Sequence, residues 1–253
     1  MLPESQSIRA NRAPRDAYPM LENFRTVRLK FSKTGSMQYV SHLDLQRNFA
    51  RILIRAGIPI WYTKGFNPHA KLVFGLPLSI GAQSVCEFLD VRIERDMPVE
   101  EIMQRLNAEM TEEMQISRAY IPAPEADFCN VSWAEYEIRM CCDGLTDELP
   151  AQIEAYLTTS PLMIEKKSKS GVREMDMIPL IRTVKAGYDG CGAARTLCLQ
   201  CVLGACGADY LNPEYVVRAI CDRFSLMAGD AAREEYSVMR RRVLLADGET
   251  EFV

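Results

Sequence analysis

Residues 39–77 read YVSHLDLQRNFARILIRAGIPIWYTKGFNPHAKLVFGLP and predict a helix, a turn, a loop and a strand in that order. Ser41, followed three residues later by Asp44, resembles a capping box and predicts that a helix begins here. Apolar residues then recur at helical spacing until a glycine and a proline end the helix, which places it over residues 42–56. The loop that follows leads into an apolar strand at residues 72–74, so one connected unit contains both histidines of the chain.

Most of the positive charge of this acidic protein lies in and just before the same stretch. Residues 25–74 contain nine Lys and Arg residues and a single acid, Asp44, which gives a net charge of +8. The whole chain has a formal net charge of −4, so the remainder carries −12. An asymmetry of this size says more about binding partners than about the fold, and it favours an anionic partner.

Three arginines, Arg47, Arg51 and Arg55, are spaced four residues apart on the predicted helix and therefore form one ridge. A row of guanidinium groups matches the phosphates of a nucleic acid backbone. An ordinary solvated helix face is the alternative interpretation. Because Lys64 and Lys71 follow close by, we predict that these five cations contribute to an RNA-binding surface.

Residues 65–71, GFNPHAK, predict a fixed loop because Gly, Asn and Pro occur together. The loop presents the amide of Asn67, which joins the predicted phosphate-binding set, and the imidazole of His69. An imidazole titrates near neutral pH, so His69 and then His42 are the candidates for proton transfer. A structural Asn-Pro turn with an incidental histidine is the alternative. Residues expected to support the two motifs are Tyr39, Ser41, Asp44, Gly65, Phe66 and Pro68.

Aromatic residues near these cations could stack on bases or could belong to the core. They are Trp61, Tyr62 and Phe66, and no aromatic signature of the common RNA-binding sheets appears on the predicted strands. A second, smaller basic stretch, KKSKSG at residues 166–171, predicts a hairpin-like loop. This loop either extends a phosphate-facing surface or is simply solvated.

The segments SHLDLQRNFARILIRAGIP, GFNPHAKLVFGLPLSIGAQS and CEFLDV resemble a bacterial family of radical-SAM-linked proteins, a domain of unknown function. In other chains the domain is fused to, or encoded beside, a cobalamin-type radical S-adenosylmethionine (SAM) protein. The resemblance covers residues 24–245 and implies a bacterial, cytoplasmic protein that works with a radical enzyme. The element order is also similar, more weakly, to that of RNA-binding and RNA-cleaving proteins of the RAMP superfamily.

Hydrophobic periodicity predicts an α+β fold of two tandem ferredoxin-like units, each with βαββαβ order and an antiparallel sheet. A disordered or loosely docked arm is expected over residues 1–23, the first unit over 24–122 with both motifs, and the second over 130–253. The expected strands lie at residues 25–31, 72–74, 85–93 and 114–121, then at 133–140, 161–166 with 178–184 as an extension, 195–203 and 236–245; the helices begin at residues 42, 99, 149 and 213.

The nine cysteines are odd in number and lack the spacing of a disulfide framework, which indicates reduced thiols in a cytoplasm. No secretory signal and no apolar stretch long enough to span a membrane is present. Cys191, Cys198 and Cys201 do not have the C-x3-C-x2-C spacing of a radical SAM cluster, and residues three apart on a strand point to opposite faces. We therefore predict no metal site and no cofactor in this chain.

The leading hypothesis is an accessory or substrate-recognition protein of a radical SAM system that binds RNA through the basic surface of the first unit. We expect no reaction by this chain alone. One alternative is an enzyme acting on RNA or a phosphorylated substrate, with His69 and His42 in proton transfer. Another is a protein–protein adaptor that docks an acidic surface of the radical SAM partner. The sequence indicates no oligomeric state.

Overall fold

The computed structural model describes residues 12–253 except residue 160 and residues 169–170, 191–194 and 229–234. The chain divides into two compact units, Met1–Phe128 with Val253, and Cys129–Phe252. Both units combine helices with antiparallel strands, so the chain has the expected α+β fold. None of the helices in the described parts of the chain is long and apolar enough to cross a membrane.

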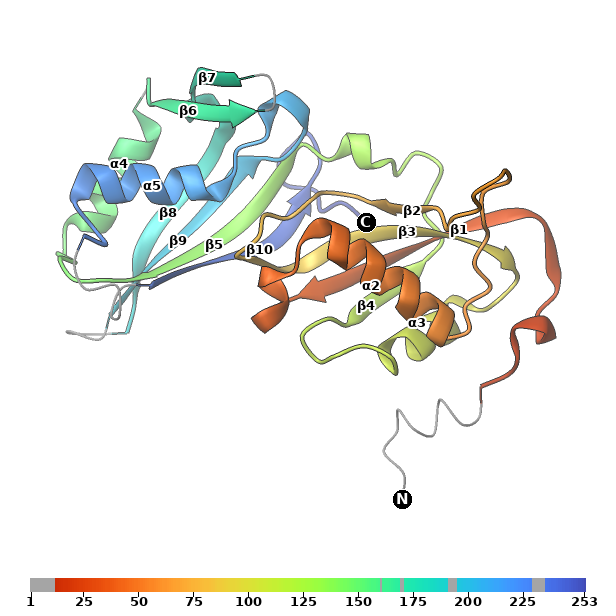
Figure 1. The fold of residues 1–253 in the computed structure, drawn as a ribbon. Coiled ribbons are helices and arrows are strands. Elements are labelled where there is room, and N and C mark those ends of the chain that lie inside the picture. The colour runs from red at the N-terminus through yellow and green to blue at the C-terminus, as the bar shows by residue number, and fades with distance from the viewer. Residues whose placement is uncertain (1–11, 160, 169–170, 191–194, 229–234) are drawn as a thin grey trace. The chain divides into compact units, whose positions relative to one another are not determined.

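Unit 1 has the element order βαββαβ, as Figure 1 shows. Its strands pair antiparallel in the spatial order β4-β1-β3-β2. The elements are β1 (Met20–Lys33), α2 (His42–Arg55), β2 (Leu72–Phe74), β3 (Ala82–Arg95), α3 (Val99–Asn107) and β4 (Ile116–Tyr120).

Helix α2 begins at the predicted cap. The Ser41 hydroxyl oxygen accepts a hydrogen bond from the backbone N–H of Asp44 at 3.2 Å, and the Ser41 hydroxyl donates to the Asp44 carboxylate at 2.7 Å. Hydrogen bonds from Ser41 and Arg47 hold the pKa of Asp44 below its usual range. After the helix, Gly57 has φ +67°, a conformation that glycine adopts without strain, so the chain turns back toward the sheet.

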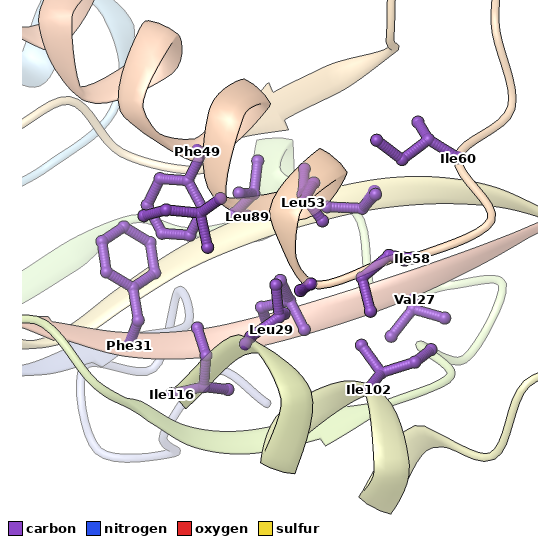
Figure 2. Packing of buried hydrophobic residues seen from close by; sticks show 14 of the residues in the cluster. Val27, Leu29, Phe31, Phe49, Leu53, Ile58, Ile60, Leu89, Ile102 and Ile116 are labelled. Atoms are coloured by element: carbon purple, nitrogen blue, oxygen red, sulfur yellow. The ribbon is translucent and has the colours of Figure 1, made fainter. Parts of the chain in front are cut away.

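The core of unit 1 lies between the two helices and one face of the sheet (Figure 2). Side chains two apart on β1, at Val27, Leu29 and Phe31, are fully buried on this face. Phe49 of α2 packs edge-to-face on Phe31, with ring centroids 4.8 Å apart. Because both α-helices contribute to this one cluster, the opposite face of the sheet receives no α-helix from the described part of unit 1.

The segment before β1 contacts unit 1 through α3. The buried Arg105 donates to the carbonyl of Ala13 at 2.9 Å and to the hydroxyl of Tyr18 at 2.7 Å. Of the expected arm over residues 1–23, residues 12–19 are therefore docked here and the last four belong to β1. Residues 1–11 lie outside the described residues.

Unit 2 repeats the βαββαβ order and adds a separate hairpin. Its main strands pair antiparallel in the order β10-β5-β9-β8, and β6 pairs only with β7. The elements are β5 (Trp133–Cys141), α4 (Leu149–Thr158), β6 (Met163–Ser168), β7 (Gly171–Asp176), β8 (Ile181–Asp189), β9 (Thr196–Gly204), α5 (Pro213–Phe224) and β10 (Glu235–Leu244).

The hairpin of β6 and β7 shows that one strand of unit 2 was predicted at the wrong place. Residues 161–166 were expected in the main sheet with 178–184 as their extension, but β8 is the sheet strand and pairs with β9. The reason is that β6 finds its partner in β7, a strand whose alternating charged sequence gave no signal of its own. The KKSKSG stretch does join two paired strands, as predicted, although residues 169–170 lie outside the described residues.

Truncation of Phe49 tests the core. We expect Phe49→Ala to lower the free energy of unfolding by about 3–5 kcal/mol, because a fully buried ring leaves a cavity. On the same helix Ile54 is 62% exposed, so Ile54→Ala should change it by less than about 0.5 kcal/mol. Urea unfolding monitored by circular dichroism measures both, and equal effects would contradict this packing of α2.

Candidate nucleic-acid interface

The sheet face of unit 1 that points away from α2 and α3, here called the outer face, carries a mixture of cations and aromatic rings. On β1 the residues between the core positions point to this face. Strand register then places side chains beside them: Arg28 lies between Asp90 and Tyr120, Lys30 between Phe88 and Arg118, and Thr26 beside Arg92.

Arg28 is the fixed centre of the outer face. Its Nε and one terminal nitrogen donate to the two carboxylate oxygens of Asp90 at 2.7 and 2.9 Å, and its side chain is only 3% exposed. Burial by itself would lower the pKa of Arg28, but the hydrogen bonds and the charge of Asp90 more than offset this and raise the pKa above its usual value. Arg28 therefore stays charged and is neutralised by Asp90.

A segment that follows β4, residues 122–128 and here called the strap, lies against the outer face. The second terminal nitrogen of Arg28 donates to the carbonyl of Ala126 at 2.7 Å, and its guanidinium carbon is 4.2 Å from the centre of the Phe128 ring. Phe128 also touches Gly75, where an added Cβ would come within 2.7 Å of its ring. These contacts hold the strap on the sheet.

Three further cations on or beside the outer face have no ion pair within the described residues: Lys71, Arg92 and Arg118. Arg92 lies over aromatic rings, with its guanidinium carbon 4.0 Å from the centre of Phe24 and 5.5 Å from that of Trp61. Arg118 lies 4.6 Å from the ring of Tyr120. The face thus combines unneutralised cations with stacking surfaces.

A pocket of about 450 Å³ opens between the outer face and the strap. Thr26, Arg28, Asp90 and Arg92 line it from the sheet, Lys71 from the residue before β2, and strap residues form the opposite wall. This volume lies within the range of small-molecule sites in proteins. Among the predicted phosphate-binding residues, Lys71 is the one that lines it.

The predicted arginine ridge lies elsewhere in unit 1, on the helix that covers the inner face of the sheet. Arg47 forms an exposed ion pair with Asp44 at 3.1 Å, and Arg55 is paired with Glu109 at 3.3 Å. Arg51 is exposed and has no ion pair in the described chain. The ridge and the outer-face cations therefore belong to two separate surfaces.

The GFNPH loop forms a compact exposed turn. His69 is fixed by Thr63, whose hydroxyl oxygen is 3.1 Å from both the backbone nitrogen and Nδ1 of His69. Nδ1 is also 3.3 Å from the carbonyl oxygen of Asn67. Lys64, Asn67 and the completely exposed Phe66 extend from the same loop.

His42 occupies a different place, at the first turn of α2. Its Nε2 is 3.0 Å from the side-chain nitrogen of Gln46, and its ring packs edge-to-face on Phe74. In the described structure neither imidazole forms an ion pair with a carboxylate, and the two do not contact each other. His69 and His42 therefore lie at two separate places in unit 1, and each stays a separate candidate for proton transfer.

Sequence reasoning missed a buried polar cluster beside His42. Lys33 and Glu87 are 2% and 5% exposed, and both line a small cavity together with His42. Lys33 donates to the carbonyl of Gln38 at 3.2 Å. The signal was available, because Lys33 continues the inward-pointing alternation of β1 beyond the point where the strand was expected to end.

The outer-face residues Phe24, Arg92 and Arg118 were also missed. They belong to three different strand regions and become neighbours of Arg28 and Lys71 only through strand register. No periodicity within one segment reveals such a set. Local charge density pointed to α2 and not to this face.

In the described part of the chain, the cysteines do not gather into a metal-binding group. On β9, Cys201 lies opposite Tyr136 in the core and Cys198 lies opposite Arg139 on the other face, as expected for residues three apart. Burial raises the pKa of Cys201 to about 12. Among the described residues no group of three or more His, Cys, Asp or Glu side chains could hold a metal ion, and Cys191 lies outside them.

Residues 26–213 match the profile of a bacterial family described as "Uncharacterized protein conserved in bacteria (DUF2344)". The chain belongs to this family. The match includes all of β1 from Thr26 and both motifs, so the pocket-lining side chains of the DUF2344 chain lie within the matched region. No curated protein matches the chain.

Solved structures similar to the DUF2344 chain are distant. A chain in the "Crystal Structure of a Cbf5-Nop10-Gar1 Complex" has 11% identity and a TM-score of 0.44, covering 91% of this chain and 51% of that one. An unknown protein from Galdieria sulphuraria has 9% identity and a TM-score of 0.23, covering 86% and 99%. The DUF2344 chain thus spans about half the length of the first of these.

Removal of the Asp90 carboxylate tests the centre of the outer face. We expect Asp90→Ala to lower the free energy of unfolding by about 3–5 kcal/mol, because it leaves the buried Arg28 charge uncompensated. The double variant Arg28→Met/Asp90→Leu should recover most of this loss, since it removes both charges together. Chemical denaturation measures each variant.

The matched control is the pair of Arg139 and Asp189, in which both side chains are exposed. Asp189→Ala should leave the stability nearly unchanged, because water and salt screen such a pair. A double variant as unstable as Asp90→Ala would show that the Arg28 pair does not act through charge burial.

Proposed function

We propose that this DUF2344 protein binds single-stranded RNA on the outer face of unit 1 and acts as an accessory or substrate-recognition protein of a radical SAM system. One observation carries the RNA proposal: Lys71, Arg92 and Arg118 lack ion pairs within the described residues, and Arg92 and Arg118 lie over aromatic rings on the face of the unit 1 sheet opposite α2 and α3.

Antiparallel sheets are well suited to this task. Single-stranded RNA presents unstacked bases and a phosphate at every nucleotide, and a sheet face can offer rings for the bases and cations for the phosphates. Phe24, Trp61 and Tyr120 supply the rings on the outer face. The βαββαβ order and the matching strand order of the two units support the view that both are ferredoxin-like units.

The radical SAM partner is proposed on the resemblance of the SHLD and GFNPH segments to radical-SAM-linked proteins, which also supports a cytoplasmic location. The chemistry in this proposal belongs to the partner. A proton-transfer role for His69 and His42 has less support, because the hydrogen-bond partners of each imidazole are neutral groups.

A second candidate function, docking of a protein, is favoured by the exposed side of α2. Leu43, Arg47, Arg51 and Ile54 follow one another at helical spacing, and the two apolar residues are 53% and 62% exposed. Interfaces between proteins combine apolar side chains with arginine in this way, whereas a phosphate-binding ridge gains nothing from exposed leucine or isoleucine. We propose that this stripe docks an acidic surface of the radical SAM partner.

Two triple variants separate the surfaces. We expect Lys71→Gln/Arg92→Gln/Arg118→Gln to weaken binding of a mixed-sequence 12-nucleotide RNA by at least about 10-fold, and to make the log–log salt slope shallower by about 2. The physical reason is that three phosphate contacts are lost. Fluorescence anisotropy at several salt concentrations measures both quantities.

Arg47→Ala/Arg51→Ala/Arg55→Ala is the matched control, with the same number of cations removed. It should keep most of the RNA affinity. If this variant loses binding while the outer-face variant keeps it, the RNA site is the helix ridge. Thermal unfolding by circular dichroism verifies that both variants fold.

Co-purification of the proposed radical SAM partner tests whether α2 is the docking surface. We expect Arg47→Glu/Arg51→Glu to abolish co-purification of the cobalamin-type radical SAM protein from an RNase-treated lysate, because two charges of the docking stripe are reversed. Mass spectrometry of the captured material provides the measurement. The outer-face triple variant should capture the partner normally, and its failure to do so would place the docking surface on the sheet.

A further inference from the structure

The pocket between the outer face and the strap has one closed side. The strap is held down by the hydrogen bond from Arg28 to the carbonyl of Ala126 and by Phe128, which touches both Arg28 and Gly75. The ring of Phe128 lies so close to Gly75 that not even a Cβ fits between them. An RNA strand that runs along the outer face cannot pass beneath the strap, so it must end or leave the sheet at the pocket.

Five charged side chains line the pocket: the cations Arg28, Lys71 and Arg92, and the acids Asp90 and Asp127. Arg28 is neutralised by its bidentate contact with Asp90, whereas Lys71 and Arg92 have no ion pair within the described residues. A phosphodiester within a strand carries one negative charge, but a terminal phosphate monoester carries about 1.5 to 2 at neutral pH. Lys71 and Arg92 can both donate to one phosphate, and the strap closes one side of the pocket, so the arrangement suits a terminal phosphate better than an internal one.

Two aromatic rings also hold the side chain of Arg92 in a position from which it can contact a phosphate. The rings of Phe24 and Trp61, with centroids 5.0 Å apart, both lie within cation–π distance of its guanidinium group. Ring contacts fix the side chain, and no carboxylate of the described chain pairs with its N–H donors. Planar guanidinium donors suit phosphate oxygens. The half-exposed Phe24 ring offers an adjacent surface for a base.

We infer that this pocket binds the terminal, phosphorylated nucleotide of a single-stranded RNA, with Lys71 and Arg92 on the phosphate. The inference rests on the proposed RNA binding and adds the part of the RNA that is recognised. A pocket volume of about 450 Å³ accommodates one nucleotide rather than a longer segment. The phosphate can be carried by either end of the strand, and the experiment distinguishes the two.

The experiment compares three 12-nucleotide RNAs of one sequence: with a 5′-phosphate, with a 3′-phosphate, and with neither, each labelled internally. By fluorescence anisotropy, one of the phosphorylated RNAs should bind about 10-fold more tightly than the unphosphorylated RNA, the size of one additional charge-assisted contact. In Lys71→Gln and in Arg92→Gln this ratio should fall to about 1, whatever the absolute affinity.

Arg118→Gln is the matched control, because Arg118 lies on the outer face but does not line the pocket. It should weaken binding of all three RNAs and keep the ratio. Equal affinities of the three RNAs for the wild-type protein would overturn the inference and leave the proposed RNA binding intact. A ratio that survives in both pocket variants would overturn it as well.

Titration of mononucleotides distinguishes a failure of the pocket inference from a failure of the proposed RNA binding. Adenosine 5′- and 3′-monophosphate and adenosine are titrated by calorimetry into the wild-type protein and the Lys71→Gln variant. Binding of one monophosphate that depends on Lys71, without binding of any RNA, would reject the RNA function and the RNA part of the inference, and would leave the pocket as a site for a free mononucleotide. If neither the RNAs nor the monophosphates bind, both the pocket and the RNA function are wrong.

Discussion

The outer face of unit 1 depends on the buried pair of Arg28 and Asp90. Two strands meet at this pair, which fixes the neighbouring β1 and β3 through two hydrogen bonds of 2.7 and 2.9 Å. The third nitrogen of the same guanidinium holds the strap at Ala126. A lysine could not replace it, because a single ammonium group cannot contact both carboxylate oxygens and the strap in one plane. One side chain thus fixes the sheet, the strap and the floor of the pocket.

The buried pair of Arg28 and Asp90 also distinguishes Arg28 from the other cations at the pocket. The desolvation of Arg28 is offset by Asp90, so its charge serves the fold. Lys71 and Arg92 border the same pocket without such a partner in the described chain, and the carboxylate of Asp127 lines the pocket with them. The fold thus separates one cation that is neutralised by an acid, Arg28, from two cations without an ion pair in the described chain, Lys71 and Arg92.

Features that depend on local sequence were predictable. The Ser41 cap, the α2 helix and most strand positions follow from capping chemistry and periodicity within single segments. Features that depend on pairing were not. Strand β6 finds a partner in its own hairpin rather than in the main sheet, and the site residues Phe24, Arg92 and Arg118 reach Arg28 only through register. Lys33 fits the alternation rule, but the expected strand ended two residues before the observed one.

The +8 segment now has a physical interpretation as two surfaces rather than one. Period-2 alternation on a strand sends Arg28 and Lys30 to the outer face, whereas the helical period sends Arg47 and Arg51 to the solvent side of α2. The core of unit 1 lies between these surfaces, so a single ligand of modest size cannot contact both. The two surfaces also differ in chemistry, since aromatic rings accompany the cations on the sheet and aliphatic side chains accompany them on the helix. Stacking suits bases and aliphatic contact suits a protein, which is the reason for proposing a different anionic partner for each surface.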